Sequence, residues 1–158
     1  MPIVELPLLW LLVINILAWA FIHIILSLWT VTIPIEKFMK NNDLYKIQNW
    51  ERSGAFWDRH FHVKRWKDRI PDGTKIIGQG FEKSAIIGKS KNHLRLYVYE
   101  SRRAEFNHWL SMLPALLFFL WNPFWAGMLM IVYALVFNLP IIIVQRFNRA
   151  RLEKVLKL

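Results

Sequence analysis

Two long stretches without a formal charge limit what this chain can fold into. The first runs from Leu6 to Ile35 and the second from Trp109 to Val144, and neither contains Lys, Arg, Asp or Glu. About 20 predominantly apolar residues suffice to cross the hydrocarbon core of a bilayer. Hydrophobic residues make up 55% of the chain, above the roughly 45–50% that is usual for soluble domains. The pattern therefore excludes a soluble domain and predicts a membrane protein.

The first apolar stretch, residues 6–35, is expected to form a transmembrane helix that is retained. A cleaved signal peptide is the alternative, but residues 1–5 contain no positive charge. The stretch is also longer than the roughly 7–15 apolar residues of a signal peptide. Its polar side chains include His23, which at membrane depth is either functional or hydrogen-bonded to another helix.

The second apolar stretch is interrupted by Asn122-Pro123. Proline disfavours a helical conformation in the residue before it, so we expect a hairpin with its turn at this point. Its arms are residues 104–121 and 124–145. Only about 13 residues of the first arm are apolar, so this arm either spans the membrane or is re-entrant.

The basic residues are distributed unevenly along the chain. The net charge is +10; residues 36–103 hold 16 Lys and Arg against 8 Asp and Glu, and the tail 146–158 holds five more basic residues. Cytoplasmic loops of membrane proteins are enriched in Lys and Arg. The chain is therefore expected to be an all-α, multi-pass protein of the cell membrane with about three transmembrane helices. Its N-terminus would lie outside and its C-terminus in the cytoplasm. Topology already accounts for the positive charge, so no nucleic-acid partner is expected.

Residues 36–103 are expected to form a small basic segment at the cytoplasmic membrane surface. Trp57 and Phe61 share a helical spacing, which suits a helix lying among the lipid headgroups. A small soluble subdomain below the membrane is an alternative, and the two are compatible. Leu94–Tyr99 fits either a strand or the first turns of the helix that leads into the hairpin.

Glu105 and His108 are the strongest catalytic candidates. On a helix they are three residues apart and share a face. A carboxylate near an imidazole can hold its tautomer, which suits a general base. The alternative is an ordinary interfacial belt, with Trp109 as the membrane anchor. The chain has no second Glu-x-x-His pair, which a di-metal helical bundle would need, so no metal site is expected.

Two further basic stretches are candidate binding sites. Trp66–Gly73 alternates its charges before a turn, which suits a loop that binds phosphate or sugar, although a solvated turn is the simpler alternative. The arginines of the tail either bind phosphates of lipids or of a nucleotide-bearing substrate, or anchor the topology. The chain has no cysteine, which excludes a cysteine nucleophile.

Five motifs in order along the chain resemble those of a known family. They are Trp50-Glu51-Arg52-x-Gly54, Trp66-Lys67-Asp68-x-Ile70-Pro71-Asp72-Gly73, Gly80-Phe81-x-Lys83, Arg103-x-Glu105-x-x-His108-Trp109 and Phe147-Asn148-Arg149-x-Arg151-Leu152. Together they resemble the glycosyl-4,4'-diaponeurosporenoate acyltransferases, small membrane enzymes of staphyloxanthin-type carotenoid synthesis in Gram-positive bacteria. The resemblance covers roughly Trp50 to Leu152, while the N-terminal helix is similar only in character.

The resemblance implies transfer of a fatty acyl group to the primary hydroxyl of a sugar on a C30 carotenoid, at the inner membrane face. His108 would be the general base and Glu105 would orient it. Basic side chains would bind donor phosphates or the developing oxyanion, and carboxylates would bind sugar hydroxyls. The substrate-binding residues expected on this basis are Arg103, Lys67, Arg149, Arg151, Glu51 and Asp68.

The resemblance implies no cofactor, with acyl-CoA or another acyl thioester as co-substrate. The expected partners are membrane lipids, the acyl donor and a glycosylated carotenoid or other glycolipid acceptor. The alternative is a non-enzymatic membrane subunit whose basic cytoplasmic face binds anionic lipid or a partner protein. That alternative predicts that substitutions at Glu105 and His108 have no effect on function.

Overall fold

The computed structural model describes residues 6–40, 42–70 and 90–157, and all regular structure in them is helical. The helices are α1 (Leu8–Thr32), α2 (Glu36–Met39), η1 (Asn49–Gly54), α3 (Ala55–Phe61), α4 (Val63–Trp66), η2 (Lys67–Arg69), α6 (Lys91–Met112), η4 (Leu113–Leu120) and α7 (Phe124–Leu156). The predicted all-α class is confirmed for this part of the chain.

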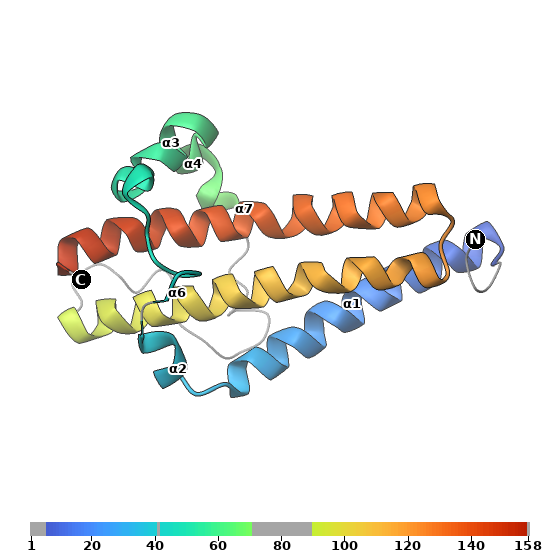
Figure 1. Ribbon diagram of the computed structural model, residues 1–158, viewed down its shortest axis with the longest axis horizontal. Helices are drawn as coiled ribbons and strands as arrows, with labels where there is room; N and C mark the ends of the chain where they lie inside the picture. Colours follow the sequence, from blue (N-terminus) through green and yellow to red (C-terminus); the bar gives the residue numbers. More distant parts are fainter. Residues whose placement is uncertain (1–5, 41, 71–89, 158) are drawn as a thin grey trace.

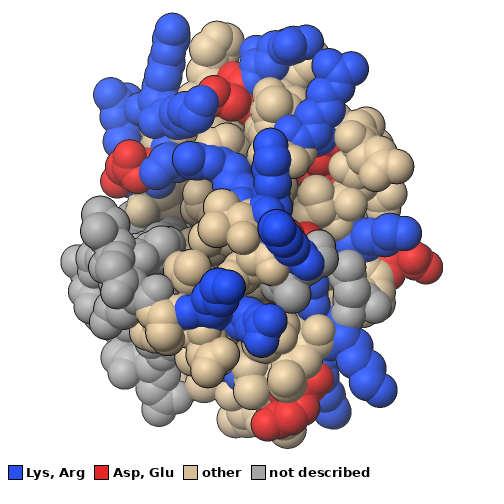
Figure 2. All heavy atoms as spheres, turned by 90° about the vertical axis from the view of Figure 1, so that its left-hand side faces the viewer, with Lys and Arg blue, Asp and Glu red and all other residues tan. Residues whose placement is uncertain are grey.

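Three long rods run along the molecule: α1, α6 continued by η4, and α7 (Figure 1). The turn between η4 and α7 lies near the N-terminus, at one end of the molecule. The short helices and the C-terminus lie toward the opposite end. Seen from that opposite end, the surface is crowded with Lys and Arg side chains and has few acidic ones (Figure 2). The basic segments that are far apart in the sequence therefore gather at one end.

Two of the rods are long and apolar enough to cross a membrane, namely α1 and the apolar part of α7. Large apolar side chains cover the outside of α1; Leu9, for example, is 71% exposed. In water such a surface would be unfavourable, whereas lipid tails solvate it well. The structure therefore fits a membrane protein with at least these two apolar helices.

The predicted hairpin turn is confirmed at Trp121–Pro123, with α7 beginning at Phe124. The apolar part of the first arm is short and passes from α-helix into the 3₁₀-helix η4 at Leu113. At 1.5 and 2.0 Å per residue in the two helix types, the stretch from Trp109 to Leu120 extends about 20 Å. That is less than the roughly 30 Å of a hydrocarbon core, so a third full crossing stays a prediction.

Other boundaries differ from the sequence expectation. α6 begins at Lys91 rather than near residue 104, so Leu94–Tyr99 belongs to its first turns, which is one of the two alternatives expected for this stretch. The basic tail 146–158 is not a separate segment, because α7 continues unbroken through Leu156. The aromatic stretch around Trp57 is two short helices separated by His62, whose φ is 51°. Trp57 and Trp66 pack against a buried core that includes Phe147 of α7.

Polar side chains fasten α1 to the hairpin turn. Asn15 is 6% exposed and exchanges two hydrogen bonds with Asn122, at 2.9 and 2.8 Å. Its Oδ1 also accepts a hydrogen bond from Trp121 Nε1 at 2.8 Å. Next to this cluster, Trp19 stacks on Phe118 with 4.6 Å between ring centroids. Because polar groups buried in an apolar environment must find partners, these amides fix how α1 meets the hairpin.

We expect Asn15→Ala to lower the free energy of unfolding by about 1–2 kcal/mol, because it leaves Trp121 Nε1 and the Asn122 amide short of partners. Thermal unfolding in a neutral detergent would measure the change. The matched control is Ile16→Ala, since Ile16 is 68% exposed on the same helix and should matter little. Equal losses in the two variants would contradict a specific role for the amide cluster.

Candidate active site

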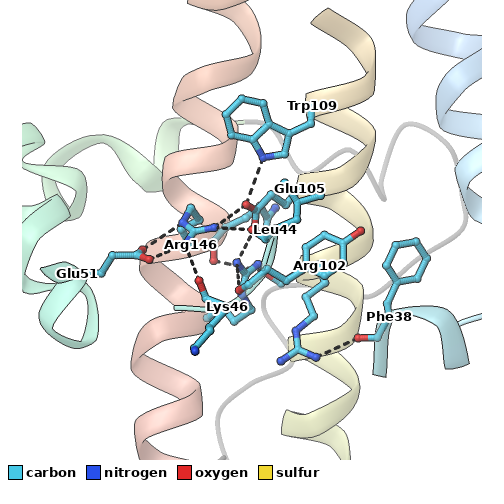
Figure 3. A network of polar contacts seen from close by, with 12 residues as sticks. Phe38, Leu44, Lys46, Glu51, Arg102, Glu105, Trp109 and Arg146 are labelled. Carbon is cyan, nitrogen blue, oxygen red and sulfur yellow. Dashed lines mark hydrogen bonds and ion pairs between the residues drawn. The ribbon is translucent and has the colours of Figure 1, made fainter. Parts of the chain in front are cut away.

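A network of buried ion pairs holds the basic end of the molecule together (Figure 3). Arg146 of α7 lies between two fully buried carboxylates, Glu51 of η1 and Glu105 of α6. Its Nη1 donates to Glu105 Oε1 at 2.8 Å, and its Nε donates to Glu51 Oε2 at 3.1 Å. One guanidinium thus ties together three elements that are far apart in the sequence.

The same guanidinium also fixes the chain between α2 and η1. Arg146 donates to the backbone carbonyls of Leu44 at 3.0 Å and Lys46 at 2.9 Å. A guanidinium has five N–H donors in a planar fork and is therefore suited to several acceptors at once. The irregular segment around Tyr45 is in this way held against α7.

The carboxylate of Glu51 is fully engaged. Besides Arg146, it accepts hydrogen bonds from Trp57 Nε1 at 2.7 Å and from the Gln48 backbone N–H at 2.8 Å. Burial by itself would raise the pKa of Glu51, but the hydrogen bonds from Arg146, Gln48 and Trp57 outweigh it and hold that pKa below its ordinary value. Glu51 is therefore an ionised anchor. The predicted contact with a sugar hydroxyl would have to displace one of these donors.

A second arginine extends the network from Glu105. Arg149, which is fully buried, pairs with Glu105 and donates to the Tyr45 carbonyl at 3.0 Å. Nearby, Arg102 pairs with Glu153 at 3.0 Å and donates to the carbonyl of Phe38 at 3.1 Å. Their carboxylate and carbonyl partners offset part of the free-energy cost of removing these cations from water. Arg149 therefore has a structural role in the site, because it is buried and does not reach the surface where a substrate phosphate would bind.

His108 lies one helical turn after Glu105 on α6, and its contacts indicate which nitrogen is the base. His108 Nδ1 is 2.9 Å from Asn138 Oδ1, and Asn138 Nδ2 donates to the carbonyl of Ala134 at 2.8 Å. That donation fixes the orientation of the amide, so Oδ1 is the acceptor and His108 Nδ1 carries the hydrogen. In the neutral ring the lone pair is then on Nε2, which is the arrangement a general base needs.

Glu105 has partners of its own: Arg146, Arg149 and Trp109, whose Nε1 donates to it at 3.3 Å. The prediction that Glu105 orients His108 therefore stays a prediction, and the side chain seen against Nδ1 is Asn138. Asn138 is fully buried. Sequence reasoning missed it, although a carboxamide within an uncharged apolar stretch is by itself an indication of a polar contact.

The other predicted binding residues lie in different places. A groove of about 660 Å³ beside α7 is lined by Lys67, Asp68 and Arg151, among others. Lys67 pairs with Asp68 at 2.7 Å, and Asp68 is mostly exposed. Arg103 lies away from the groove, where it pairs with Glu100 at 3.2 Å and donates to the Ile33 carbonyl at 3.2 Å. Tertiary structure thus brings three of the six predicted binding residues together.

Parts of two predicted motifs, Pro71-Asp72-Gly73 and Gly80-Phe81-x-Lys83, lie outside the described residues. Sequence reasoning also gave no structural role to Arg146, which proves to be central, because its charge resembled that of the other basic residues of the tail. In the ranges 6–40, 42–70 and 90–157, no three His, Asp or Glu side chains converge as ligands for a metal ion would.

Arg146→Gln should lower the free energy of unfolding by about 3 kcal/mol or more, because Glu51 loses its cationic partner while it remains buried. Thermal unfolding of the purified protein in detergent measures the loss. The matched control is Arg95→Gln, since Arg95 is exposed on α6 and its replacement should change stability by no more than about 0.5 kcal/mol.

The double variant Glu51→Gln/Arg146→Gln gives a second test. It should lose less stability than the sum of the two single variants, because the single variants each leave one partner unpaired. Strictly additive losses would contradict a direct coupling between the two side chains.

Comparison with known proteins shows the family of the chain. The model of the glycosyl-4,4'-diaponeurosporenoate acyltransferase family matches residues 41–158, which include η1, α6 and α7. The glycosyl-4,4'-diaponeurosporenoate acyltransferases of Staphylococcus aureus strains bovine RF122 / ET3-1 and MRSA252 are 31% and 32% identical to this chain over 140 residues. Each alignment covers 89% of this chain and 84% of the relative. No solved structure matches it. The chain therefore belongs to the glycosyl-4,4'-diaponeurosporenoate acyltransferase family and is an acyltransferase.

Proposed function

We propose that this enzyme transfers a fatty acyl group from a thioester to the primary hydroxyl of a sugar on a C30 carotenoid, at the cytoplasmic face of the membrane. The acceptor is proposed from the names of the chain's relatives. The observation that carries the reaction type is the contact between His108 Nδ1 and Asn138 Oδ1. With the hydrogen on Nδ1, the lone pair of the neutral ring is on Nε2, the atom proposed to accept the proton of an attacking hydroxyl.

The proposed step moves one proton and exchanges one bond. His108 Nε2 takes the proton of the sugar hydroxyl while the hydroxyl oxygen attacks the acyl carbonyl carbon. The tetrahedral intermediate then collapses, the C–S bond breaks, and the imidazolium returns the proton to the thiolate. The products are an ester and a free thiol, and His108 is again neutral. General-base catalysis of this kind contributes about 10²–10⁴ in rate.

The proposed site of the reaction follows from the substrates and the distribution of charge. Both the acyl donor and a glycosylated carotenoid have an apolar tail and a polar head, so their reacting groups meet at the membrane surface. His108 follows the polar part of α6 and directly precedes the apolar stretch that begins at Trp109. An N-terminus outside and a cytoplasmic C-terminus would put this position at the inner face.

His108→Ala should lower acyl transfer by at least about 10²-fold while leaving the amount of protein in the membrane unchanged. The measurement is mass spectrometry of the acylated product, formed by membranes supplied with the glycosylated carotenoid and an acyl thioester. His60→Ala is the matched control, because His60 is an exposed histidine at the same end of the molecule. Undiminished product from His108→Ala would remove the histidine from the mechanism.

Asn138 is proposed to position His108 without touching the substrate. Asn138→Ala should lower kcat by about tenfold or more, with little change in KM for either substrate, because the ring loses the acceptor that fixes its tautomer. Asn138→Asp retains an acceptor and adds a negative charge, so it should move the acid limb of the pH–rate profile to higher pH. An unmoved pH profile together with an unchanged kcat would show that the contact serves packing alone.

A further inference from the structure

The charged side chains that line the groove beside α7 are mostly basic. Its walls carry four basic side chains, Arg52, Lys67, Arg151 and Lys154, against one carboxylate, Asp68. It is formed by the turn before α3 together with the first residue of α3, by η2, by Tyr97 of α6 and by the C-terminal part of α7, so it lies at the basic end of the molecule (Figure 1). Figure 2 faces this end and shows how little acidic surface accompanies the Lys and Arg side chains there.

Three of the four cations of the groove differ from those of the buried network, because they have no anionic partner among the described residues; the fourth, Lys67, pairs with Asp68. Arg52, Arg151 and Lys154 are exposed, and in the part of the chain that the structure describes none of them forms an ion pair. Arg146 and Arg149, on the same helix, are neutralised by buried carboxylates. Three positive charges are therefore available at the groove for an anion from solution.

The wall of the groove is built in a fixed and strained conformation. Arg52, Ser53 and Gly54 in succession have positive φ values of 48°, 56° and 89°. Two non-glycine residues in this region are unusual, and such strain persists only where the surroundings enforce it. Here the turn lies on α7 so closely that a Cβ on Gly54 would be 3.1 Å from the Phe147 carbonyl oxygen. The turn holds Arg52 and Ser53 at the groove.

The side chain of Arg151, on α7, is held in place by two neighbours. Its guanidinium carbon lies 5.4 Å from the centroid of the Phe147 ring, a distance typical of a cation–π contact. Its Cγ would be 3.4 Å from a Cβ on Gly54. Arg151 therefore packs against both the ring and the strained turn, which reduces the freedom that its side chain would lose on binding an anion.

The lining of the groove also includes the apolar residues Tyr97 and Val144. Tyr97 lies on the same helix as the proposed base, His108. Tyr97 and His108 are eleven residues apart on α6, which places them on nearly the same face and about 16 Å apart along the helix axis. An extended thioester arm covers a span of this size. A ligand bound in the groove beside Tyr97 would need an arm of about this length along α6 to bring its thioester near His108.

From this arrangement we infer that the groove binds the phosphate-bearing, nucleotide half of the acyl donor, with Arg52, Arg151 and Lys154 as phosphate ligands. This inference rests on the proposed function for the identity of the reaction, and it names the donor as an acyl thioester of coenzyme A. Charge-assisted hydrogen bonds from guanidinium groups to phosphate are strong and directional. Phosphates of membrane lipids share this chemistry, so the test has to separate the two sources.

The test measures binding of free coenzyme A to the purified full-length protein in neutral detergent. Arg52→Gln and Arg151→Gln should each weaken binding by about tenfold, as expected for the loss of one charge-assisted contact. The matched control is Arg65→Gln, since Arg65 is an exposed arginine of α4 outside the groove lining, and its affinity should equal that of the parent. In turnover, the groove variants should raise KM for the acyl thioester and leave KM for the glycosylated acceptor unchanged.

A second measurement decides between the two phosphate sources. The same variants are compared for association with nanodiscs of phosphatidylglycerol and of phosphatidylcholine. If the arginine variants keep the affinity for coenzyme A but lose a preference for phosphatidylglycerol, the ligand is a lipid headgroup and the inference is overturned. Unchanged binding in both measurements overturns it as well.

His108→Ala separates this inference from the proposed catalysis. Its affinity for coenzyme A should equal that of the parent, because His108 is outside the groove lining. If His108→Ala stayed active while the groove variants lost coenzyme A, the proposed base would be wrong and the phosphate site would stand. If His108→Ala were inactive while the groove variants bound coenzyme A normally, the opposite would hold.

Discussion

The structure depends most on the ion pairs that Arg146 makes with Glu51 and Glu105. These side chains come from α7, η1 and α6, and Arg146 also donates to the Leu44 carbonyl, which joins the irregular segment before η1 directly to α7. A charge removed from water must find compensating partners, and here each carboxylate receives several donors. That requirement fixes the short segments near Tyr45 and Glu51 against the helix pair, and it sets the position of the turn that forms the groove wall.

The network also divides the arginines of α7 into two kinds. Arg146 and Arg149 face α6 and are neutralised, so their charge serves the fold. Arg151 is exposed on the other side, where it packs against Phe147 and has no carboxylate partner in the described part of the chain. A periodicity of 3.6 residues per turn separates these side chains onto different faces. The same basic segment thus provides both a framework and a surface for anions.

Much of the architecture could be predicted from the sequence because it follows from local properties. Two uncharged stretches predict apolar helices, and Asn122-Pro123 predicts the hairpin turn that the structure contains. The boundaries of α6 and α7 were harder to predict. The charged residues at their polar ends resemble a loop or a tail, and they are helical here because the buried ion pairs hold them against neighbouring elements.

The candidate site was predicted only in part, because most of its contacts join residues far apart in the chain. Spacing brought Glu105 and His108 to one face of a helix, but it could not show that Arg146 and Arg149 bind Glu105 or that Asn138 lies against His108.

The sequence by itself determined the family, the apolar helices and the segregation of positive charge, since these are properties of composition and order along the chain. Only the tertiary structure decided which charges are buried in pairs and which remain available. Pairing depends on the packing of α7 against α6 and η1. These elements are far apart in the sequence, so no local pattern encodes which of their side chains meet.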